Sequence, residues 1–336
     1  MTSPIQQECT STKFREIGHD NCGSVRAAEG STIAMKREDG CKWRSLLNDY
    51  NMHRLVLKTA LQERLSVCAP RWPKFIKNDD QNWWDMNLAR FRTGYTACNV
   101  LCSERIPPLP QDVRDRLIDR YCPPASIATI KAEESNRDCL VRPYLGRRKF
   151  QIEARTAPIL HRFSMRNYPL HLNKAEDLQL PILEYAHAMA ETLAMMHWVA
   201  NIDANDIEFV LGAVPTQKEI AHNVYSHEIF GIHALWVLDF DCCKPLTMDD
   251  AGIEQAAEAF MRNDPYFPRP TINEQSPDNT LWIEFRDRYL ECSHEPVTGF
   301  GGNFLSLPEK FIERVVEKIH ERHQRAHRES LLAVEV

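Results

Sequence analysis

Glycine is scarce in this sequence, with only 12 among 336 residues, and this argues against a fold built on glycine-rich loops. Long apolar runs are missing as well. None approaches the roughly 18 residues that mark a membrane-spanning helix. The first residues, MTSPIQQECTSTK, contain no apolar signal core. We therefore expect a cytoplasmic protein with no membrane partner.

The cysteines lack regular spacing. Their number, 11, is odd, and unpatterned cysteines are typical of reduced thiols in a cytosolic protein. Cys98 and Cys102 are separated by three residues, but no second pair with zinc-ligand spacing accompanies them. We therefore expect no structural zinc site, and we expect neither a metal nor another cofactor.

The composition has no excess of basic residues. A net charge of −6 gives no overall nucleic-acid signature, so we expect no DNA partner, and any RNA contact requires a local basic patch. Apolar and charged fractions of 43% and 26% are those of a soluble globular protein. The length suits one two-lobed domain or two domains.

Residues 180–241 contain the pattern around which the chain is organised. Apolar side chains recur every three or four positions after Pro181, and this predicts an amphipathic helix. Two short apolar segments, 209–211 and 235–238, predict buried strands. Between the helix and the first strand lie Asp203, Asn205, Asp206 and Glu208, and the second strand ends at Asp239-Phe240-Asp241.

This order of elements is that of a kinase catalytic core. There a loop Asp lies five residues before a metal-binding Asn, and a later strand presents a metal-binding Asp in an Asp-Phe-Gly triplet. Asp203 and Glu208 have the same five-residue separation, and Asp239 begins the corresponding triplet. The alternative is a solvated acidic turn beside two core strands.

Residues 14–37 predict three short strands. In a kinase the loop between the first two strands covers the phosphates of ATP, and a Lys on the third strand reaches them. Gly18, Gly23 and Lys36 fit that order. The middle glycine of the loop is missing, however, and His-Asp-Asn stands in the loop instead. The alternative is a generic β-meander with a surface lysine.

The helix predicted for residues 45–65 carries Asp49, the nearest acidic partner for Lys36. The whole pattern predicts an α+β, two-lobed, protein-kinase-like fold with a small, mainly-β N-lobe and a larger, mainly-α C-lobe. The expected parts are a disordered tail (1–13), the N-lobe (14–110) and the helical C-lobe with the catalytic loop (111–330), or a lobe boundary near residue 165.

Six segments together resemble a fungal family first catalogued as a domain of unknown function and sometimes mislabelled a zinc-finger protein. They are ERIPPLP, CLVRPYLG, FSMRNYPLHL, DANDIEFVLG, LWVLDFDCC and RNDPYFPRP. The resemblance runs from about residue 17 to 270, and members of that family include arginine-containing cyclodipeptide synthases. It implies transfer of arginine from arginyl-tRNA and cyclisation with the aminoacyl group of a second aminoacyl-tRNA. The product would be a cyclo(Arg-Xaa) diketopiperazine of secondary metabolism.

This reaction has clear chemical requirements. An aminoacyl ester is already activated, so neither ATP nor a metal is obligatory. The enzyme must bind a guanidinium, deprotonate an α-ammonium and stabilise an oxyanion, and carboxylates suit the first two tasks. We expect catalysis by Asp203, Asp206 and Glu208, and substrate binding by Asp239, Asp241, Asn205 and Lys36.

Two other functions fit the sequence. In an ATP-dependent small-molecule phosphotransferase, Lys36 would hold phosphates and Asp203 would orient the acceptor, while Glu208 and Asp239 would bind Mg²⁺. The other alternative is a non-catalytic pseudokinase. Glu208 stands where a kinase has Asn, and Asp241 stands where it has Gly. These departures weigh against phosphoryl transfer.

An acidic protein that uses arginyl-tRNA needs a local basic surface, because neutralisation of phosphates by Lys and Arg supplies most non-specific affinity. The C-terminal helix predicted for 307–330 is one candidate, but four glutamates dilute its charge. The segment 142–166 is denser, and its alternative interpretation is a solvated loop. We expect tRNA contacts from Arg142, Arg147, Arg148, Lys149, Arg162 and Arg166.

Overall fold

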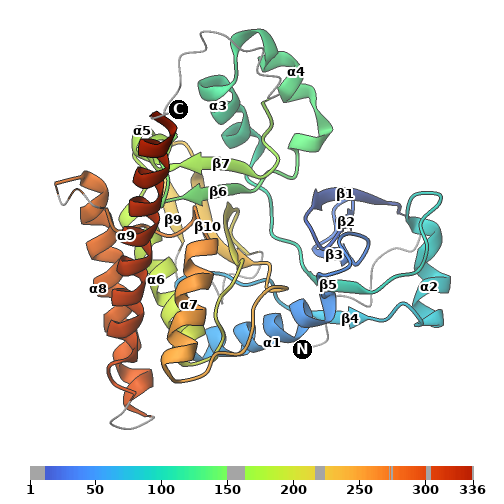
Figure 1. Cartoon of the computed structure of the whole chain (residues 1–336). Coiled ribbons are helices and arrows are strands. Elements are labelled where there is room, and N and C mark those ends of the chain that lie inside the picture. The colour runs from blue at the N-terminus through green and yellow to red at the C-terminus, as the bar shows by residue number, and fades with distance from the viewer. Residues whose placement is uncertain are drawn as a thin grey trace. The chain divides into compact units, whose positions relative to one another are not determined.

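The structure is a computed structural model in which contacts divide the chain into two compact units. It describes residues 12–149, 163–215, 224–271, 273, 275–299 and 304–334. The first unit comprises Met1–Pro143, Lys149–Leu170 and Glu208–Cys242, and the second comprises Tyr144–Arg148, His171–Ile207 and Cys243–Val336. Strands form two sheets and helices dominate toward the C-terminus (Figure 1), so the predicted α+β class is confirmed.

The first sheet has the strand order β1-β2-β3-β5-β4 and belongs to the first unit. Its strands are β1 (Phe14–His19), β2 (Ser24–Ala28), β3 (Ile33–Arg37), β4 (Lys74–Ile76) and β5 (Val100–Glu104). The three strands predicted for residues 14–37 are therefore confirmed. The turn between β1 and β2 requires glycine at Gly23, because a Cβ there would lie only 2.0 Å from the carbonyl oxygen of Arg37.

Helix α1 (Leu46–Glu63) confirms the helix predicted for residues 45–65. It begins at Ser45, whose side chain accepts a hydrogen bond from the Asn48 N–H, the usual way to satisfy a free amide at a helix start. Buried residues recur along this helix at helical spacing, and three of them are polar: Asp49, His53 and Thr59. Such residues need partners inside the protein.

The second sheet of the first unit has the order β7-β6-β8-β10-β9. Its strands are β6 (Val141–Tyr144), β7 (Tyr168–His171), β8 (Glu208–Gly212), β9 (Tyr225–His227) and β10 (Gly231–Leu238). The strands predicted at 209–211 and 235–238 are thus confirmed as β8 and β10. These two strands are antiparallel, and Glu208 pairs with Leu238. That register places Glu208 beside the end of β10, where Asp239 follows.

Short helices complete the first unit. They are α2 (Gln81–Asn87), α3 (Gln111–Tyr121) and α4 (Ile127–Ala132), with 3-10 turns at Leu88–Arg90, Pro124–Ser126 and Glu134–Asn136. Trp84 of α2 joins Met35 and Val100 in the core beneath the first sheet. This apolar layer fixes β3, the strand that carries Lys36.

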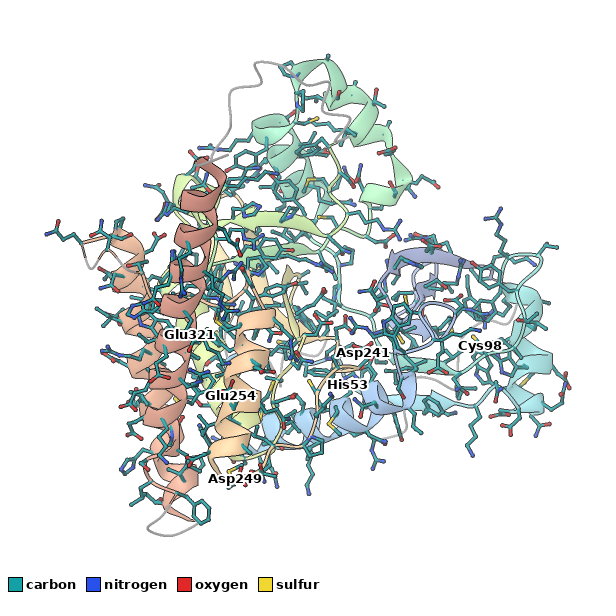
Figure 2. The ribbon with its side chains drawn as sticks, viewed as in Figure 1. His53, Cys98, Asp241, Asp249, Glu254 and Glu321 are labelled. Atoms are coloured by element: carbon teal, nitrogen blue, oxygen red, sulfur yellow. The ribbon has the colours of Figure 1, made fainter. Side chains whose placement is uncertain are left out.

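The second unit is helical. Its helices are α5 (Leu172–Asp177), α6 (Ile182–Trp198), α7 (Asp250–Arg262), α8 (Pro277–Thr298) and α9 (Leu307–Val334). Helix α6 confirms the helix predicted after Pro181, and it packs against α8 while α7 packs against α9. Glu254 of α7, labelled in Figure 2, accepts a 2.6 Å hydrogen bond from Arg314 of α9.

No helix in the described part of the chain is long and apolar enough to cross a membrane. Even α9, with 28 residues, is too polar. The tail at 1–13 and the lobes at 14–110 and 111–330 stay predictions, and residues 1–11 lie outside the described residues.

Candidate functional site

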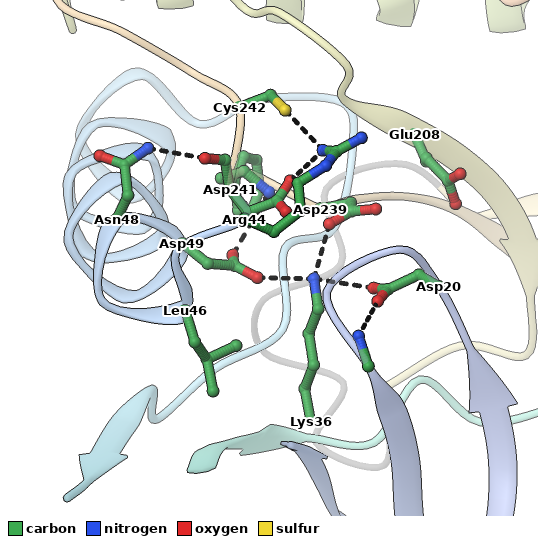
Figure 3. A network of polar contacts seen from close by, with 12 residues as sticks. Asp20, Lys36, Arg44, Leu46, Asn48, Asp49, Glu208, Asp239, Asp241 and Cys242 are labelled. Atoms are coloured by element: carbon green, nitrogen blue, oxygen red, sulfur yellow. Dashed lines mark hydrogen bonds and ion pairs between the residues drawn. The ribbon is translucent and has the colours of Figure 1, made fainter. Parts of the chain in front are cut away.

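Three carboxylates surround the ammonium group of Lys36 in the first unit (Figure 3). Lys36 Nζ lies 2.8 Å from Asp20 Oδ2, 2.8 Å from Asp49 Oδ2 and 2.7 Å from Asp239 Oδ1. The three acids come from the β1–β2 turn, from α1 and from the end of β10. Because an ammonium has three N–H donors, each carboxylate can receive one.

Burial and the neighbouring charges shift the pKa values of Lys36 and Asp239. Burial disfavours the charged form of Lys36, but the surrounding carboxylates outweigh it and hold the pKa of Lys36 well above its usual value. Burial raises the pKa of Asp239 well above its usual value, although Lys36 opposes the shift. The nearby negative charges of Glu208, Asp49 and Asp20 raise it further. The excess of negative charge in this cluster therefore favours the binding of an additional proton or of another cation.

Asp49 also holds the backbone of the triplet that begins at Asp239. Its Oδ1 accepts a hydrogen bond from the Phe240 N–H at 3.3 Å. The Phe240 ring packs 5.2 Å from the ring of His53, and His53 Nε2 lies 2.6 Å from the carbonyl oxygen of Pro70. Asp239 has a φ of 67°, which is uncommon for a residue with a side chain. These contacts fix that conformation.

Asp241 follows the cluster residue Asp239 by two positions and is buried. Its Oδ1 accepts a 2.9 Å hydrogen bond from Arg44, and its carbonyl oxygen accepts one of 2.9 Å from the side chain of Asn48 (Figure 3). Burial raises the pKa of Asp241, although Lys36 and Arg44 oppose the shift. Asp241 therefore anchors the end of the triplet to the start of α1.

Glu208 and Arg142 form an ion pair at 2.6 Å. Glu208 begins β8 and Arg142 lies on β6, the neighbouring strand. Both side chains are 20% exposed. Glu208 therefore already binds one guanidinium group, next to the strand end that carries Asp239.

These residues line one cavity of the first unit. Lys36, Asp20, Asp49, Asp239 and Glu208 form its acidic end. The apolar residues of its lining include Val25, Ala34 and Leu101 from the first sheet and Leu140, Val210 and Leu238 from beside or within the second. Other polar and charged residues also line it, among them Ser103, Glu104, Arg105, Asp138, Arg142 and Asn167.

Asp203 lies in the second unit with its carboxylate occupied by three hydrogen bonds. Oδ1 accepts from the backbone N–H groups of Asn205 and Lys244 at 3.1 and 2.8 Å, and Oδ2 accepts from Gln255 Nε2 at 2.9 Å. The side chain is buried. Its visible role is to hold the loop in shape, and a catalytic role for Asp203 stays a prediction.

The end of α7 supports the same loop. The Asp206 N–H donates a 2.6 Å hydrogen bond to Asn263 Oδ1, and Asn263 Nδ2 donates one of 2.7 Å to the carbonyl oxygen of Ala204. Ala204 and Asp206 both have positive φ values, 51° and 64°. This network constrains the backbone around Asn205, which is itself buried.

The predicted site residues thus divide between the two units. Lys36, Glu208 and Asp239 meet at one cavity of the first unit, and Asp241 anchors the triplet behind it. Asp203, Asn205 and Asp206 share a loop of the second unit. The roles of all seven residues stay predictions.

The residues predicted to contact tRNA also belong to both units. Arg142 lies at the cavity, and Arg166 pairs with Glu16 at 2.9 Å in the first unit. Lys149 is exposed. Arg162 lies outside the described residues.

Two neighbouring arginines of that stretch lie in the second unit. Arg147 pairs with Asp264 at 2.8 Å, and Arg148 pairs with Asp278 and Glu176. Arg147 is half exposed, whereas Arg148 is only 20% exposed. Arg147 therefore has the more accessible charge, and tRNA binding by this stretch stays a prediction.

Asp20 and Arg44 contribute to the site, although the sequence gives no strong sign of either. Asp20 could have been noticed because it is an acidic residue in the loop that contacts phosphates in a kinase. Arg44 directly precedes the N-cap of α1, and its pairing with Asp241 joins residues 197 positions apart. The predicted pairing of Asp49 with Lys36 is confirmed.

Comparison with protein families gives a match over part of the chain. The family model DUF3669, described as a zinc finger protein, matches residues 235–298, from β10 to α8. This agrees with the predicted resemblance to a family catalogued as a domain of unknown function under a zinc-finger label. No curated protein matches the chain, and no solved structure matches it.

The matched segment holds three cysteines and one histidine: Cys242, Cys243, Cys292 and His294. The Cys243 thiol is buried and donates to the carbonyl oxygen of Asn205 at 3.6 Å. Cys292 and His294 lie two residues apart on α8, a spacing that sends side chains to different sides of a helix. The four residues therefore do not resemble the ligand pairs of a zinc finger.

Proposed function

We propose that this protein is a tRNA-dependent cyclodipeptide synthase with a protein-kinase-like core. It would take arginine from arginyl-tRNA and join it to the aminoacyl group of a second aminoacyl-tRNA as a cyclo(Arg-Xaa) diketopiperazine. The observation that carries this proposal is the sharing of one ammonium, Lys36, by three carboxylates. This excess of negative charge attracts a guanidinium or an α-ammonium group and repels a phosphate.

The position of Asp20 gives the strongest argument against binding of a nucleoside triphosphate at Lys36. It lies in the β1–β2 turn, where a kinase loop would contact phosphates, and its carboxylate is 2.8 Å from Lys36 Nζ. A phosphate reaching Lys36 would have to displace Asp20 and would still face Asp49 and Asp239. An arginyl group meets no such repulsion, because carboxylates bind guanidinium groups with paired hydrogen bonds.

The reaction forms two amide bonds and releases two tRNAs. The α-ammonium of one aminoacyl group loses a proton, and its nitrogen attacks the ester carbonyl carbon of the other. The C–O bond to the tRNA ribose breaks, and the released ribose oxygen takes up a proton. The amine of the resulting dipeptide then attacks its own ester in the same way, which closes the ring.

The acidic end of the cavity offers groups for these steps. A raised pKa makes Asp239 a better proton acceptor near neutral pH, so we assign it the proton of the α-ammonium. Glu208, which already binds the guanidinium of Arg142, and Asp20 are assigned to the arginyl guanidinium. Lys36 stays protonated and holds Asp239 in place.

A phosphotransferase remains the second candidate. The Lys36–Asp49 pair between β3 and α1 and the position of Asp239 after β10 are arranged as in a kinase. In that case Asp239 and Glu208 would hold Mg²⁺, since carboxylate oxygens are the ligands it prefers. This function requires Asp20 to leave Lys36.

The test is incubation of the purified protein with labelled arginyl-tRNA and a mixture of other aminoacyl-tRNAs, followed by mass spectrometry. We expect a labelled cyclo(Arg-Xaa) product that forms without ATP and disappears in Asp239→Asn. Lys42→Met, at an exposed lysine, serves as the control. Absence of product together with a thermal shift of several degrees on addition of Mg-ATP would favour the phosphotransferase.

A further inference from the structure

Asp264, in the loop that follows α7, is shared by two arginines from distant parts of the second unit. Arg147 Nη2 lies 2.8 Å from Asp264 Oδ2, and Arg322 Nη1 of α9 lies 3.6 Å from the same oxygen. Because both nitrogens approach one atom, they lie close enough for a single anionic group to contact both. One carboxylate therefore faces two positive charges, the reverse of the cluster around Lys36.

A third positive charge, on Arg269, lies close to this pair. The guanidinium of Arg269 packs 4.5 Å from the centre of the Phe260 ring and donates a 2.7 Å hydrogen bond to the Phe260 carbonyl oxygen. Burial lowers the pKa of Arg269 to about 10; Asp264 opposes this shift, and the charges of Arg322 and Arg147 add to it. The three arginines and Asp264, the arginine cluster, carry a net charge of +2, and a bound anion would offset the repulsion between the guanidinium groups.

Backbone contacts fix the position of the arginine cluster. The Gly146 N–H donates a 2.9 Å hydrogen bond to the carbonyl oxygen of Pro265, and the Leu172 N–H donates one of 3.1 Å to the carbonyl oxygen of Arg147. Glycine is required at Gly146, because a Cβ there would lie 2.1 Å from the carbonyl oxygen of Phe267. The segment that carries Arg147 is therefore held against the loop that follows α7, and a site that is already ordered loses less entropy on binding.

We propose that Arg147 and Arg322 together bind one backbone phosphate of arginyl-tRNA. This inference rests on the proposed function, which requires a tRNA partner. The C-terminal helix and the basic segment after residue 142 are separate candidates in the sequence, and Asp264 brings one arginine of each to the same place. Guanidinium groups bind phosphate oxygens with paired hydrogen bonds, and such contacts supply most of the non-specific affinity for nucleic acids.

The exposure of the two arginines favours a phosphate of a large ligand over a small phosphorylated molecule. The side chains of Arg147 and Arg322 are 52% and 61% exposed. Sites for small molecules are concave and enclose most of the ligand, whereas a backbone phosphate of a nucleic acid is reached from an open surface. The arginine cluster therefore suits a polynucleotide.

Arg322 also lines a groove between α7 and α9. Besides Arg322, three basic and three acidic residues line this groove, so their charges cancel. Two of these basic residues have partners on their own helix: Arg262 pairs with Glu258 at 2.8 Å, and Arg325 pairs with Glu321 at 3.6 Å. The excess of positive charge lies at the arginine cluster, and this restricts the proposal to one phosphate rather than a long basic track.

Binding of an unacylated arginine-specific tRNA transcript, followed by fluorescence anisotropy at several salt concentrations, tests this site. Arg147→Ala and Arg322→Ala should each weaken binding by about tenfold. The variant with both changes should lower the slope of log K against log[salt] by about 0.7–0.9, the value for one phosphate. A fall of twice that size would indicate two separate phosphates and would overturn the proposal, as would an unchanged affinity or slope.

Arg116→Ala is the matched control. Arg116 lies on α3 of the first unit, its side chain is 51% exposed, and it pairs with Asp112 at 3.3 Å, so it resembles Arg147 in exposure and pairing. This variant should bind tRNA as the wild type does, and an equal loss of affinity would overturn the assignment.

Asp264→Asn tests the same site by a gain of affinity. It removes the negative charge that lies closest to the proposed phosphate and should tighten tRNA binding severalfold, whereas a variant that is merely damaged in its fold would bind more weakly. The absence of any gain would contradict a phosphate bound between Arg147 and Arg322.

The failures of the two proposals are distinguishable, because binding is measured with unacylated tRNA. If Arg147→Ala and Arg322→Ala bind tRNA as the wild type does while labelled cyclodipeptide forms, the phosphate site is wrong and the proposed function stands. If both variants lose affinity as expected and the wild type forms no cyclodipeptide, the phosphate site stands and the proposed function fails. Where product forms, Arg322→Ala should raise the KM for arginyl-tRNA about tenfold and leave kcat unchanged.

Discussion

Replacement of Lys36 by Met would leave three carboxylates facing one another without their shared cation. The Lys36 side chain is 12% exposed and that of Asp49 only 4%, so water can replace little of the lost interaction. Removing one partner of a buried ion pair costs about 3–5 kcal/mol. We expect a loss of this size in the free energy of unfolding of Lys36→Met at pH 8.

The loss should depend on pH because Asp239 can take up a proton. Its pKa is already raised by burial, and Lys36 is the cation that opposes the shift. Without Lys36 the folded-state pKa rises further above the unfolded value of about 3.9. A group with a raised folded-state pKa contributes stability that is full below the unfolded pKa and is lost as pH rises through the folded pKa. The variant should therefore be closer to the wild type in stability at pH 5 than at pH 8.

Urea unfolding followed by tryptophan fluorescence at pH 5 and pH 8 measures this difference. Lys42→Met is the matched control, because Lys42 is exposed and should change stability by no more than about 0.5 kcal/mol. Adding Asp20→Asn to Lys36→Met removes one of the three opposed charges and should restore part of the stability. A loss that is the same at both pH values, or one below about 1 kcal/mol, would refute the view of a charge-coupled cluster.

Three further outcomes follow from the geometry. Glu208→Gln should lower the rate of cyclodipeptide formation at limiting arginyl-tRNA by about 100-fold, because the arginyl guanidinium loses a charged partner. Normal turnover would show that Glu208 does not bind the substrate. Asp203→Asn should cost about 1–3 kcal/mol in urea unfolding, because a buried acceptor of backbone N–H groups is altered; an unchanged midpoint would contradict this structural role. Arg147→Ala combined with Lys149→Ala should weaken tRNA binding and lower its salt dependence. An unchanged salt slope would exclude these two residues as tRNA contacts. Arg148 is left intact because its ion pairs with Asp278 and Glu176 hold the fold.

The elements predicted from the sequence are those with local signals. The three strands of residues 14–37 are short and are separated by turns that contain glycine, one of which needs Gly23. Helix α1 begins at Ser45, a common N-cap residue. The order of the strands in the second sheet has no such local signal in the sequence. Strand β6 pairs with β8, where Val141 lies opposite Leu211 after a separation of 70 residues. Pairing over that distance depends on packing that periodicity does not encode.

The same distinction explains the candidate site. Lys36, Asp49 and Asp239 could be predicted because their order along the chain matches a kinase plan. Asp203 matched that plan equally well, yet the sequence could not show that Gln255 and a backbone amide 41 residues away occupy its carboxylate. A motif identifies the residue type at a position. The hydrogen bonds that decide its availability come from segments far along the chain.

Asp20 is the residue that makes this cluster different from a phosphate-binding one. With Asp49 and Asp239 alone, Lys36 would face two carboxylates and could still offer one N–H to an anion. Asp20 takes that third position. It lies in a turn with its side chain 22% exposed, whereas Asp49 is fixed on a helix and is almost inaccessible. A bound cation could therefore attract Asp20 away from Lys36 while the other two carboxylates keep the ammonium in place. The ligand would gain a carboxylate partner, Lys36 would keep two, and no buried charge would be left alone.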